Sequence, residues 1–181
     1  IVRGEGVWLY DTEGKRYLDC YNNVPCVGHC HPRVVEALTE QATALNVHTR
    51  YLHETVVEYG ERLTATLADD LTMLFMTCTG TESNELALRM ARKVTGKEGI
   101  ICTNATYHGN STAVHALSTA FNKGEPCGPG VKAINFPDTY RPMDGLSGST
   151  LTDALIAQLE ALIAEFHMED RTAWTKKSGL R

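Results

Sequence analysis

Short aromatic-rich runs and two amphipathic patterns fill the N-terminal part of the chain. Residues 7–10 and 16–20 are strand-like runs separated by a Thr-Glu-Gly-Lys turn, which predicts a β-hairpin. The segment 21–32 is rich in Asn, Pro, Gly and His and is expected to be a loop. Apolar residues then recur every three or four positions after Pro32, and again from Thr55, which begins a Thr-x-x-Glu capping box. This periodicity predicts two helices.

Further along the chain, strand-like and helix-like segments alternate. Residues 72–78 are a continuous apolar run, which is typical of a strand buried on both faces of a parallel sheet. The elements expected to follow are a helix at 82–95 ended by Gly96, a strand at 99–103, a helix at 110–118, a strand at 131–136 and a helix at 151–166. This alternation predicts an α/β fold with a largely parallel sheet.

Composition places the chain among ordinary globular proteins. Its 181 residues are 43% hydrophobic and 22% charged, with a formal net charge of −5, which suits neither a disordered chain nor a nucleic-acid-binding surface. No apolar run is long enough to span a membrane, and no signal peptide opens the sequence. The six cysteines form no Cys-x-x-Cys pair. We therefore expect reduced thiols and a cytoplasmic protein without nucleic-acid or membrane partners.

Four residues with metal-ligating side chains crowd into one loop: Cys26, His29, Cys30 and His31. Structural zinc sites usually combine two separated pairs of ligands, and this loop offers a single group. We therefore expect these residues to have structural or site-lining roles, and we expect no metal site.

The strongest candidate for chemistry is the segment 74–85, where a buried strand is expected to end and a helix to begin. Gly80 allows a tight turn there, and the free N–H groups of a helix start suit a phosphate. The segment lacks the Gly-Lys-Ser/Thr ending of a Walker A loop. The alternative is an ordinary strand–helix corner with Thr79 or Thr81 as its N-cap.

A second candidate follows the next expected strand, at residues 103–110. Open α/β sheets bind ligands beyond the carboxyl ends of their strands. Tyr107 or His108 is suited to stacking on a flat ring there, and Gly109 allows close approach. The alternative is a tyrosine that only covers the sheet edge. Together with the phosphate-type corner, this loop favours a flat phosphorylated cofactor.

Polar loops at 22–32 and 46–53 flank the first predicted helix and are suited to closing over a site. Arg50 and Tyr51 would meet an anionic substrate there. The alternative is a pair of structural loops with hydrogen-bonded histidines. The sequence has neither a Gly-x-Ser-x-Gly elbow nor a His-Glu-x-x-His helix, so serine hydrolases and metalloproteases have no support.

A family resemblance rests on four motifs, at residues 3–11, 28–32, 79–84 and 107–109. Over about residues 1–166, the chain resembles the N-terminal part of class III (ω-type) aminotransferases, which are fold type I pyridoxal-phosphate enzymes. The segments 22–32 and 49–53 look most like the branch that contains amino-alcohol-phosphate phospho-lyases. The resemblance implies an α/β fold of the fold type I PLP-transferase kind and pyridoxal 5′-phosphate as cofactor.

The same resemblance implies the roles of individual residues. Gly80 and Thr81 would hold the cofactor phosphate, and Tyr107 would stack on the pyridine ring. The full cofactor-binding set is Gly80, Thr81, Asn84, Tyr107, His108 and Gly109, and the substrate-lining set is Tyr51, Asn22 and Asn23.

The chain lacks two residues that the family chemistry needs. These are a lysine that forms the Schiff base with the cofactor and an acidic residue that pairs with the pyridinium nitrogen, and nothing in the sequence matches either motif. We therefore expect an inactive N-terminal fragment without catalytic residues. Its expected parts are an N-terminal hairpin and helices at 1–70, the first part of the cofactor-binding domain at 71–166 and an unrelated tail at 167–181.

For the intact parent, the resemblance implies a PLP-dependent homodimer that transfers an amine from an amino donor to a keto acid or an aldehyde. One alternative is a phospho-lyase that acts on an amino-alcohol phosphate. The other is a truncated, non-catalytic fragment that at most binds a phosphorylated ligand.

Overall fold

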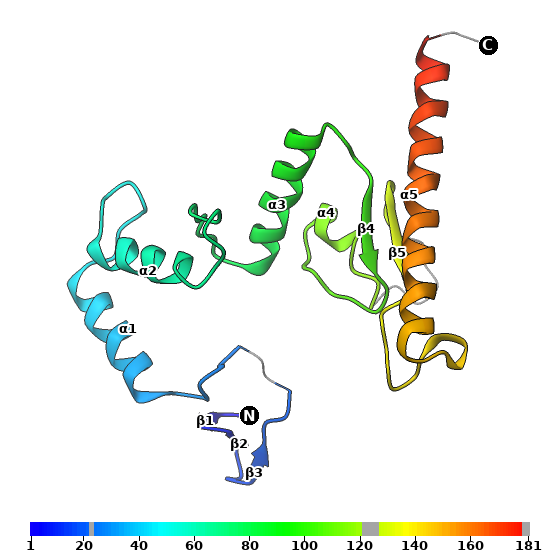
Figure 1. Cartoon of the computed structure of the whole chain (residues 1–181). Coiled ribbons are helices and arrows are strands. Elements are labelled where there is room, and N and C mark those ends of the chain that lie inside the picture. The colour runs from blue at the N-terminus through cyan, green and yellow to red at the C-terminus, as the bar shows by residue number, and fades with distance from the viewer. Residues whose placement is uncertain (22–23, 121–126, 179–181) are drawn as a thin grey trace. The chain divides into compact units, whose positions relative to one another are not determined.

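The computed structural model describes residues 1–21, 24–120 and 127–178, with side chains as far as residue 167 (Figure 1). The chain forms two compact units, Ile1–Leu74 and Phe75–Arg181. In the described residues, the first unit contains a three-stranded sheet and the second a two-stranded one.

The sheet of the first unit confirms the predicted hairpin and adds a strand to it. Strands β2 (Trp8–Tyr10) and β3 (Arg16–Leu18) pair antiparallel, and β1 (Arg3–Glu5) pairs with the other edge of β2. The Asp11 carboxylate closes the turn by accepting the Lys15 N–H at 2.9 Å and the Tyr17 hydroxyl at 2.8 Å. The hydrogen bond from Tyr17 stabilises the charged form and lowers the pKa of Asp11.

The two predicted helices follow as α1 (Pro32–Ala44) and α2 (Glu54–Thr64). Pro32 occupies the first turn of α1, as expected. The predicted capping box of α2 is wrong, because the helix begins before Thr55 and its N-cap is His53, which makes no side-chain capping bond. Both apolar faces are largely exposed in the described structure; examples are Leu38 on α1 and Tyr59 on α2.

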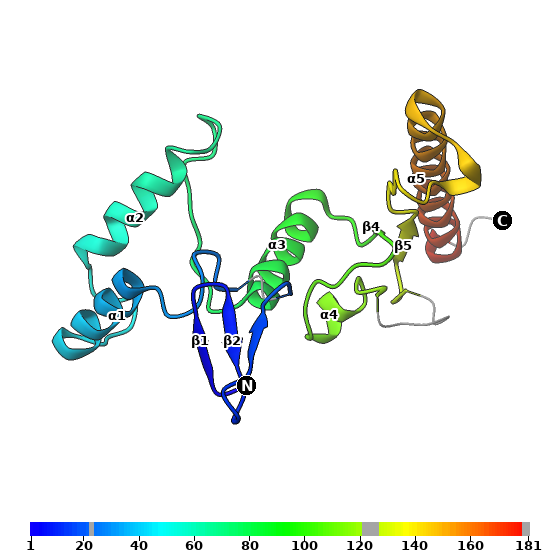
Figure 2. The same ribbon diagram turned by 90° about the horizontal axis from the view of Figure 1, so that it is seen from below.

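The second unit is built around two parallel strands, β4 (Ile100–Thr103) and β5 (Val131–Ile134). Helix α3 (Gly80–Thr95) precedes β4, and helix α4 (Thr112–His115) lies between the strands in sequence. The short 3₁₀ helix η1 (Met143–Gly145) leads into the long helix α5 (Gly148–Ser178), which lies beside β5 in both views (Figures 1 and 2).

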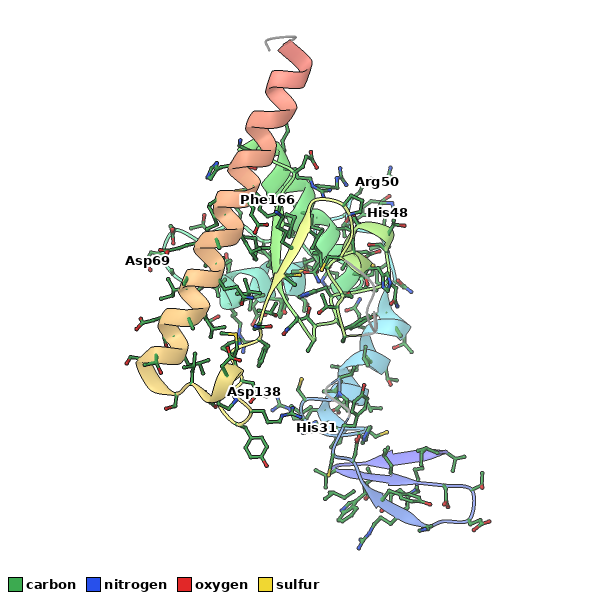
Figure 3. All side chains as sticks on the ribbon, turned by 90° about the vertical axis from the view of Figure 1, so that its right-hand side faces the viewer. His31, His48, Arg50, Asp69, Asp138 and Phe166 are labelled. Carbon is green, nitrogen blue, oxygen red and sulfur yellow. The ribbon has the colours of Figure 1, made fainter. Side chains whose placement is uncertain are left out.

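Two polar contacts attach helix α5 to the sheet. The Asn135 N–H, just after β5, donates to the Gln158 side chain at 2.9 Å, and Lys132 of β5 contacts two residues of the helix. Lys132 forms a 2.7 Å ion pair with Glu165 of α5. Its ammonium also lies 4.7 Å from the centre of the ring of Phe166, a residue of α5 that Figure 3 labels. These contacts hold the helix against the sheet at residues 158, 165 and 166.

A small apolar core holds the elements of the second unit together. Its buried members are Leu88 of α3, Val114 of α4 and Leu117, and Ile100 and Val131 of the two strands pack against them. The core therefore joins both helices to the two strands whose carboxyl ends are expected to carry the site.

Three predicted elements, at 72–78, 110–118 and 151–166, need correction. Residues 72–78 were expected to form a strand, but they do not, because no described segment pairs with them to complete a hydrogen-bonded ladder. Phe75 is accordingly 59% exposed. Helix α4 is shorter than the predicted 110–118, and α5 continues beyond the predicted end at Phe166 to Ser178.

Candidate functional site

Two side chains, Thr79 and Glu82, cap the first turn of α3. Thr79 is the N-cap, and its hydroxyl accepts the Glu82 N–H at 3.1 Å. The Glu82 carboxylate in turn accepts the Cys78 N–H at 2.6 Å. In the described residues, the N–H groups of Gly80 and Thr81 donate to no protein acceptor, so they are available to an anion at the positive end of the helix dipole.

Replacing Thr79 with Ala is expected to destabilise the second unit by about 1 kcal/mol, because the Glu82 N–H loses its acceptor. Urea unfolding followed by circular dichroism measures the change. Thr152→Ala on α5 is the control, since the Thr152 hydroxyl donates back to the Gly148 carbonyl of its own helix instead of accepting a backbone N–H. If the two variants lost the same free energy of unfolding, the capping role of Thr79 would be contradicted.

The loop after β4 approaches the same helix start very closely. Gly109 has a φ of +142°, and a Cβ atom at this position would lie 3.0 Å from the Thr81 Cα and closer still to the Thr81 hydroxyl. The next residue, Asn110, donates its N–H to the Thr81 hydroxyl at 3.4 Å. A glycine is therefore required where the loop passes α3.

A side chain of α3 also holds this loop. The Asn84 amide donates to the His108 carbonyl at 2.8 Å, so Asn84 contacts the backbone next to Tyr107. Tyr107 itself is 52% exposed. The structure thus brings together all six residues of the expected cofactor-binding set, from two segments of the chain: Gly80, Thr81 and Asn84 on α3, and Tyr107, His108 and Gly109 on the loop.

A cavity of about 340 Å³ adjoins this contact and includes Asn84, His108, Thr103 and Cys102 in its wall. Burial raises the pKa of the Cys102 thiol to about 11, with a further contribution from the neighbouring Cys127. The thiol therefore stays protonated near neutral pH, and the wall of the cavity at this point is uncharged.

The expected substrate-lining residues lie in the first unit. Asn22 and Asn23 are outside the described residues. Tyr51 stacks on His48, with ring centres 5.2 Å apart and planes at 20°. Tyr51, His48 and His53 line a mostly apolar cavity of about 360 Å³ between α1 and α2. The Tyr51 side chain is 66% exposed, so it lines the cavity and also faces solvent.

In the loop that contains Cys26, His29, Cys30 and His31, His29 makes the hydrogen bonds that hold the loop to the rest of the first unit. Its Nε2 lies 2.6 Å from a carboxylate oxygen of Asp19, whose side chain is only 7% exposed. Its backbone exchanges two hydrogen bonds with Gly6, at 2.7 and 3.0 Å. Within the described part of the chain, no three His, Cys, Asp or Glu side chains gather in a way that could hold a metal ion.

Comparison with known proteins agrees with these features. The family model described as "Aminotransferase class-III" matches residues 1–173. The chain belongs to this family. Its fold is accordingly that of fold type I PLP-dependent transferases, and the cofactor of the family is pyridoxal 5′-phosphate. The matched range includes residues 167–173, which belong to the segment 167–181 that was expected to be an unrelated tail.

Three relatives show the range of the likeness. The chain is 38% identical over 170 residues to an alanine–glyoxylate aminotransferase 2-like protein of Drosophila melanogaster, covering 91% of this chain and 33% of that protein. It is 42% identical to a solved phospholyase from Arthrobacter in complex with phosphoethanolamine, with a TM-score of 0.83 and coverage of 93% and 40%. A PLP-bound amine transaminase from an uncultivated Pseudomonas species is 26% identical, with a TM-score of 0.71 and coverage of 90% and 40%.

The class III chain therefore spans about one third of that curated relative and about two fifths of the two solved chains. Among its described residues, no helix is both long and apolar enough to cross a membrane. The cytoplasmic location expected from the sequence stays a prediction.

The residues at the start of α3 fit the cofactor of the family. A phosphate group needs convergent N–H and hydroxyl donors, and Gly80 and Thr81 supply them at a helix N-terminus. The close passage of Gly109 leaves no side chain between the loop and this donor set. The sequence pattern indicated these residues but neither Asp19, which pairs with His29, nor Ser118, which accepts the His108 N–H. Each contact joins residues ten positions apart and belongs to no recognisable motif.

Proposed function

We propose that this chain forms the phosphate- and ring-binding part of a PLP-dependent enzyme that transfers an amine from an amino donor to a keto acid or an aldehyde. The observation that carries the proposal is the contact between the start of α3 and the loop after β4, at Thr81, Gly109 and Asn110. This contact places phosphate-type donors beside the loop that carries Tyr107.

Each residue of the cofactor-binding set has a distinct task in this proposal. Gly80 and Thr81 hold the phosphate through N–H groups and a hydroxyl, and Tyr107 stacks on the ring. Asn84 fixes the backbone of His108, and Gly109 permits the close approach. Pyridoxal phosphate, when bound, supplies an electron sink that stabilises negative charge on the substrate carbon.

A phospho-lyase acting on an amino-alcohol phosphate is the second candidate. It is supported by the 42% identity to the Arthrobacter phospholyase, whose structure contains phosphoethanolamine.

For either reaction, we propose that Tyr51, Asn22 and Asn23 line the substrate pocket. A complete parent enzyme given phosphoethanolamine distinguishes the two: release of inorganic phosphate identifies the lyase, and amine exchange onto a keto acid identifies the aminotransferase.

Binding of pyridoxine 5′-phosphate tests the cofactor site in this chain. This analogue has no aldehyde, so it reports the phosphate and ring contacts without any covalent bond to lysine. We expect binding, followed by the fluorescence of the analogue, and a loss of about tenfold in affinity for Thr81→Val, which removes one hydroxyl donor. Thr95→Val, at the opposite end of α3, should bind as the wild type does. No binding by the wild-type chain would overturn the proposal.

We further propose that the chain alone does not catalyse turnover, because no lysine of the described part stands in the proposed site. Lys132, for example, is engaged by Glu165 and the Phe166 ring. Pyridoxal phosphate followed by borohydride should therefore give no stoichiometric adduct at a single lysine. Mass spectrometry of a tryptic digest measures this, and one fully modified lysine would contradict it.

We also propose that the complete enzyme is a homodimer. The apolar faces of α1 and α2 support this, because Val34, Leu38 and Val56 are about half exposed or more in the described structure. Such faces usually mark surfaces that another chain covers. Analytical ultracentrifugation of the complete parent tests the stoichiometry.

A further inference from the structure

Ser118, which follows α4, is fully buried and hydrogen-bonded on both sides. Its hydroxyl oxygen accepts the His108 N–H at 3.0 Å, and its O–H donates to the Val114 carbonyl at 3.3 Å. The first bond reaches the residue next to Tyr107. Ser118 belongs to none of the sets discussed above.

The backbone around Tyr107 is fixed on either side of this residue. On one side, the His108 peptide is held by Ser118 at its N–H and by Asn84 at its carbonyl, the latter at 2.8 Å. On the other side, the Thr106 N–H donates to the Thr119 hydroxyl at 3.1 Å, and the Thr106 carbonyl accepts the N–H of the residue after Thr119 at 2.9 Å.

The loop needs such anchors because its conformation is costly. Ala105 has a φ of +57° and Gly109 a φ of +142°, both in the region that L side chains rarely adopt. A backbone of this kind persists only where surrounding contacts determine it. The hydroxyls of Ser118 and Thr119 are two of these contacts.

We propose that Ser118 is a positioning residue that holds the ring of Tyr107 in place for stacking on the cofactor, acting through the His108 backbone. The inference rests on the proposed function, since it assigns Ser118 to the same site. Without the hydroxyl, the His108 N–H loses its acceptor in a partly buried place. The loop then relaxes and Tyr107 is no longer held in one orientation.

A double-mutant cycle with pyridoxine 5′-phosphate tests this role. Ser118→Ala and Ser118→Cys should each weaken binding about tenfold, which corresponds to about 1.4 kcal/mol. Ser118→Cys keeps nearly the same volume and is only a weak acceptor, so a loss shared by both variants comes from the hydrogen bond. Ser111→Ala is the matched control, because Ser111 directly follows the loop but its hydroxyl accepts the Val114 N–H at the start of α4 and no N–H of residues 106–110.

The decisive readout is the coupling to Tyr107. In the Tyr107→Ala background, Ser118→Ala should have almost no further effect on binding, because the ring it positions is absent. Amide hydrogen exchange of the 106–110 segment should also rise in Ser118→Ala and stay unchanged in Ser111→Ala.

The possible outcomes separate the two proposals. Wild-type binding with an equal loss for Ser118→Ala in both backgrounds would show a purely structural effect and overturn the positioning role alone. If the wild-type chain binds the analogue and Ser118→Ala binds it equally well, the positioning role is also overturned. Absence of binding by the wild-type chain would overturn the cofactor site itself, and the role of Ser118 with it.

Discussion

Replacing Gly109 with Ala is expected to reduce the affinity for pyridoxine 5′-phosphate more than any other single change at the site. The new Cβ would lie 3.0 Å from the Thr81 Cα and closer to the Thr81 hydroxyl. Because this neighbour includes helix backbone, the loop must move away from α3. The backbone at φ +142° adds a penalty of roughly 1–3 kcal/mol. Together these effects should lower the affinity by at least about 30-fold, as measured by fluorescence titration.

Gly96→Ala is the matched control for this variant. Gly96 ends α3 with a φ of +66°, and a Cβ atom there would meet nothing within 4 Å. It therefore carries the strain of a left-handed backbone without the close approach to Thr81. We expect Gly96→Ala to lower stability modestly and to leave the affinity within about twofold of wild type. A Gly109→Ala chain that binds like Gly96→Ala would show that the close approach has no part in binding.

Local sequence patterns predicted most elements of the second unit, because the signals there are short-range. The helix at 82–95 ends at Gly96 as expected, since a left-handed C-cap needs only that one residue. The strands β4 and β5 lie within the predicted runs, and they pair in parallel. The same signals indicated the start of α3 and the loop after β4 as candidate binding segments, and the structure brings these two segments together at Thr81 and Asn110. Their roles in cofactor binding stay predictions.

The errors concern features that a short sequence motif does not determine by itself. The run 72–78 has the composition of a buried strand, but a strand forms only beside another strand, and none of the described segments pairs with it. The capping box at Thr55 matched a motif, but α2 begins earlier, so Thr55 lies inside its first turn. Ser118 carried no sequence signal at all, since a buried serine is recognised only by the backbone it holds.

Two side chains, Ser118 and Asn84, connect the loop that carries Tyr107 to the core of the second unit. Val114 is a core residue, and its carbonyl accepts the hydroxyl of Ser118, which holds the loop. Asn84 lies on the same helix as the core residue Leu88, one turn earlier. Loss of the core should therefore reach Tyr107 through both anchors.

Leu88→Ala is the change expected to destabilise the second unit most. Leu88 is 9% exposed and packs with Val114 and Leu117 in a core of few residues. Its truncation should cost about 2–5 kcal/mol, a large share of the stability of such a small unit. Urea unfolding by circular dichroism, with amide exchange to locate the change, should show the loss in α3, β4 and the 106–110 loop. Val94→Ala on the same helix is the control, because Val94 is 84% exposed and alanine has the better helix propensity. If both variants unfolded at the same urea concentration as wild type, the Leu88 cluster would not be what holds the loop to α3.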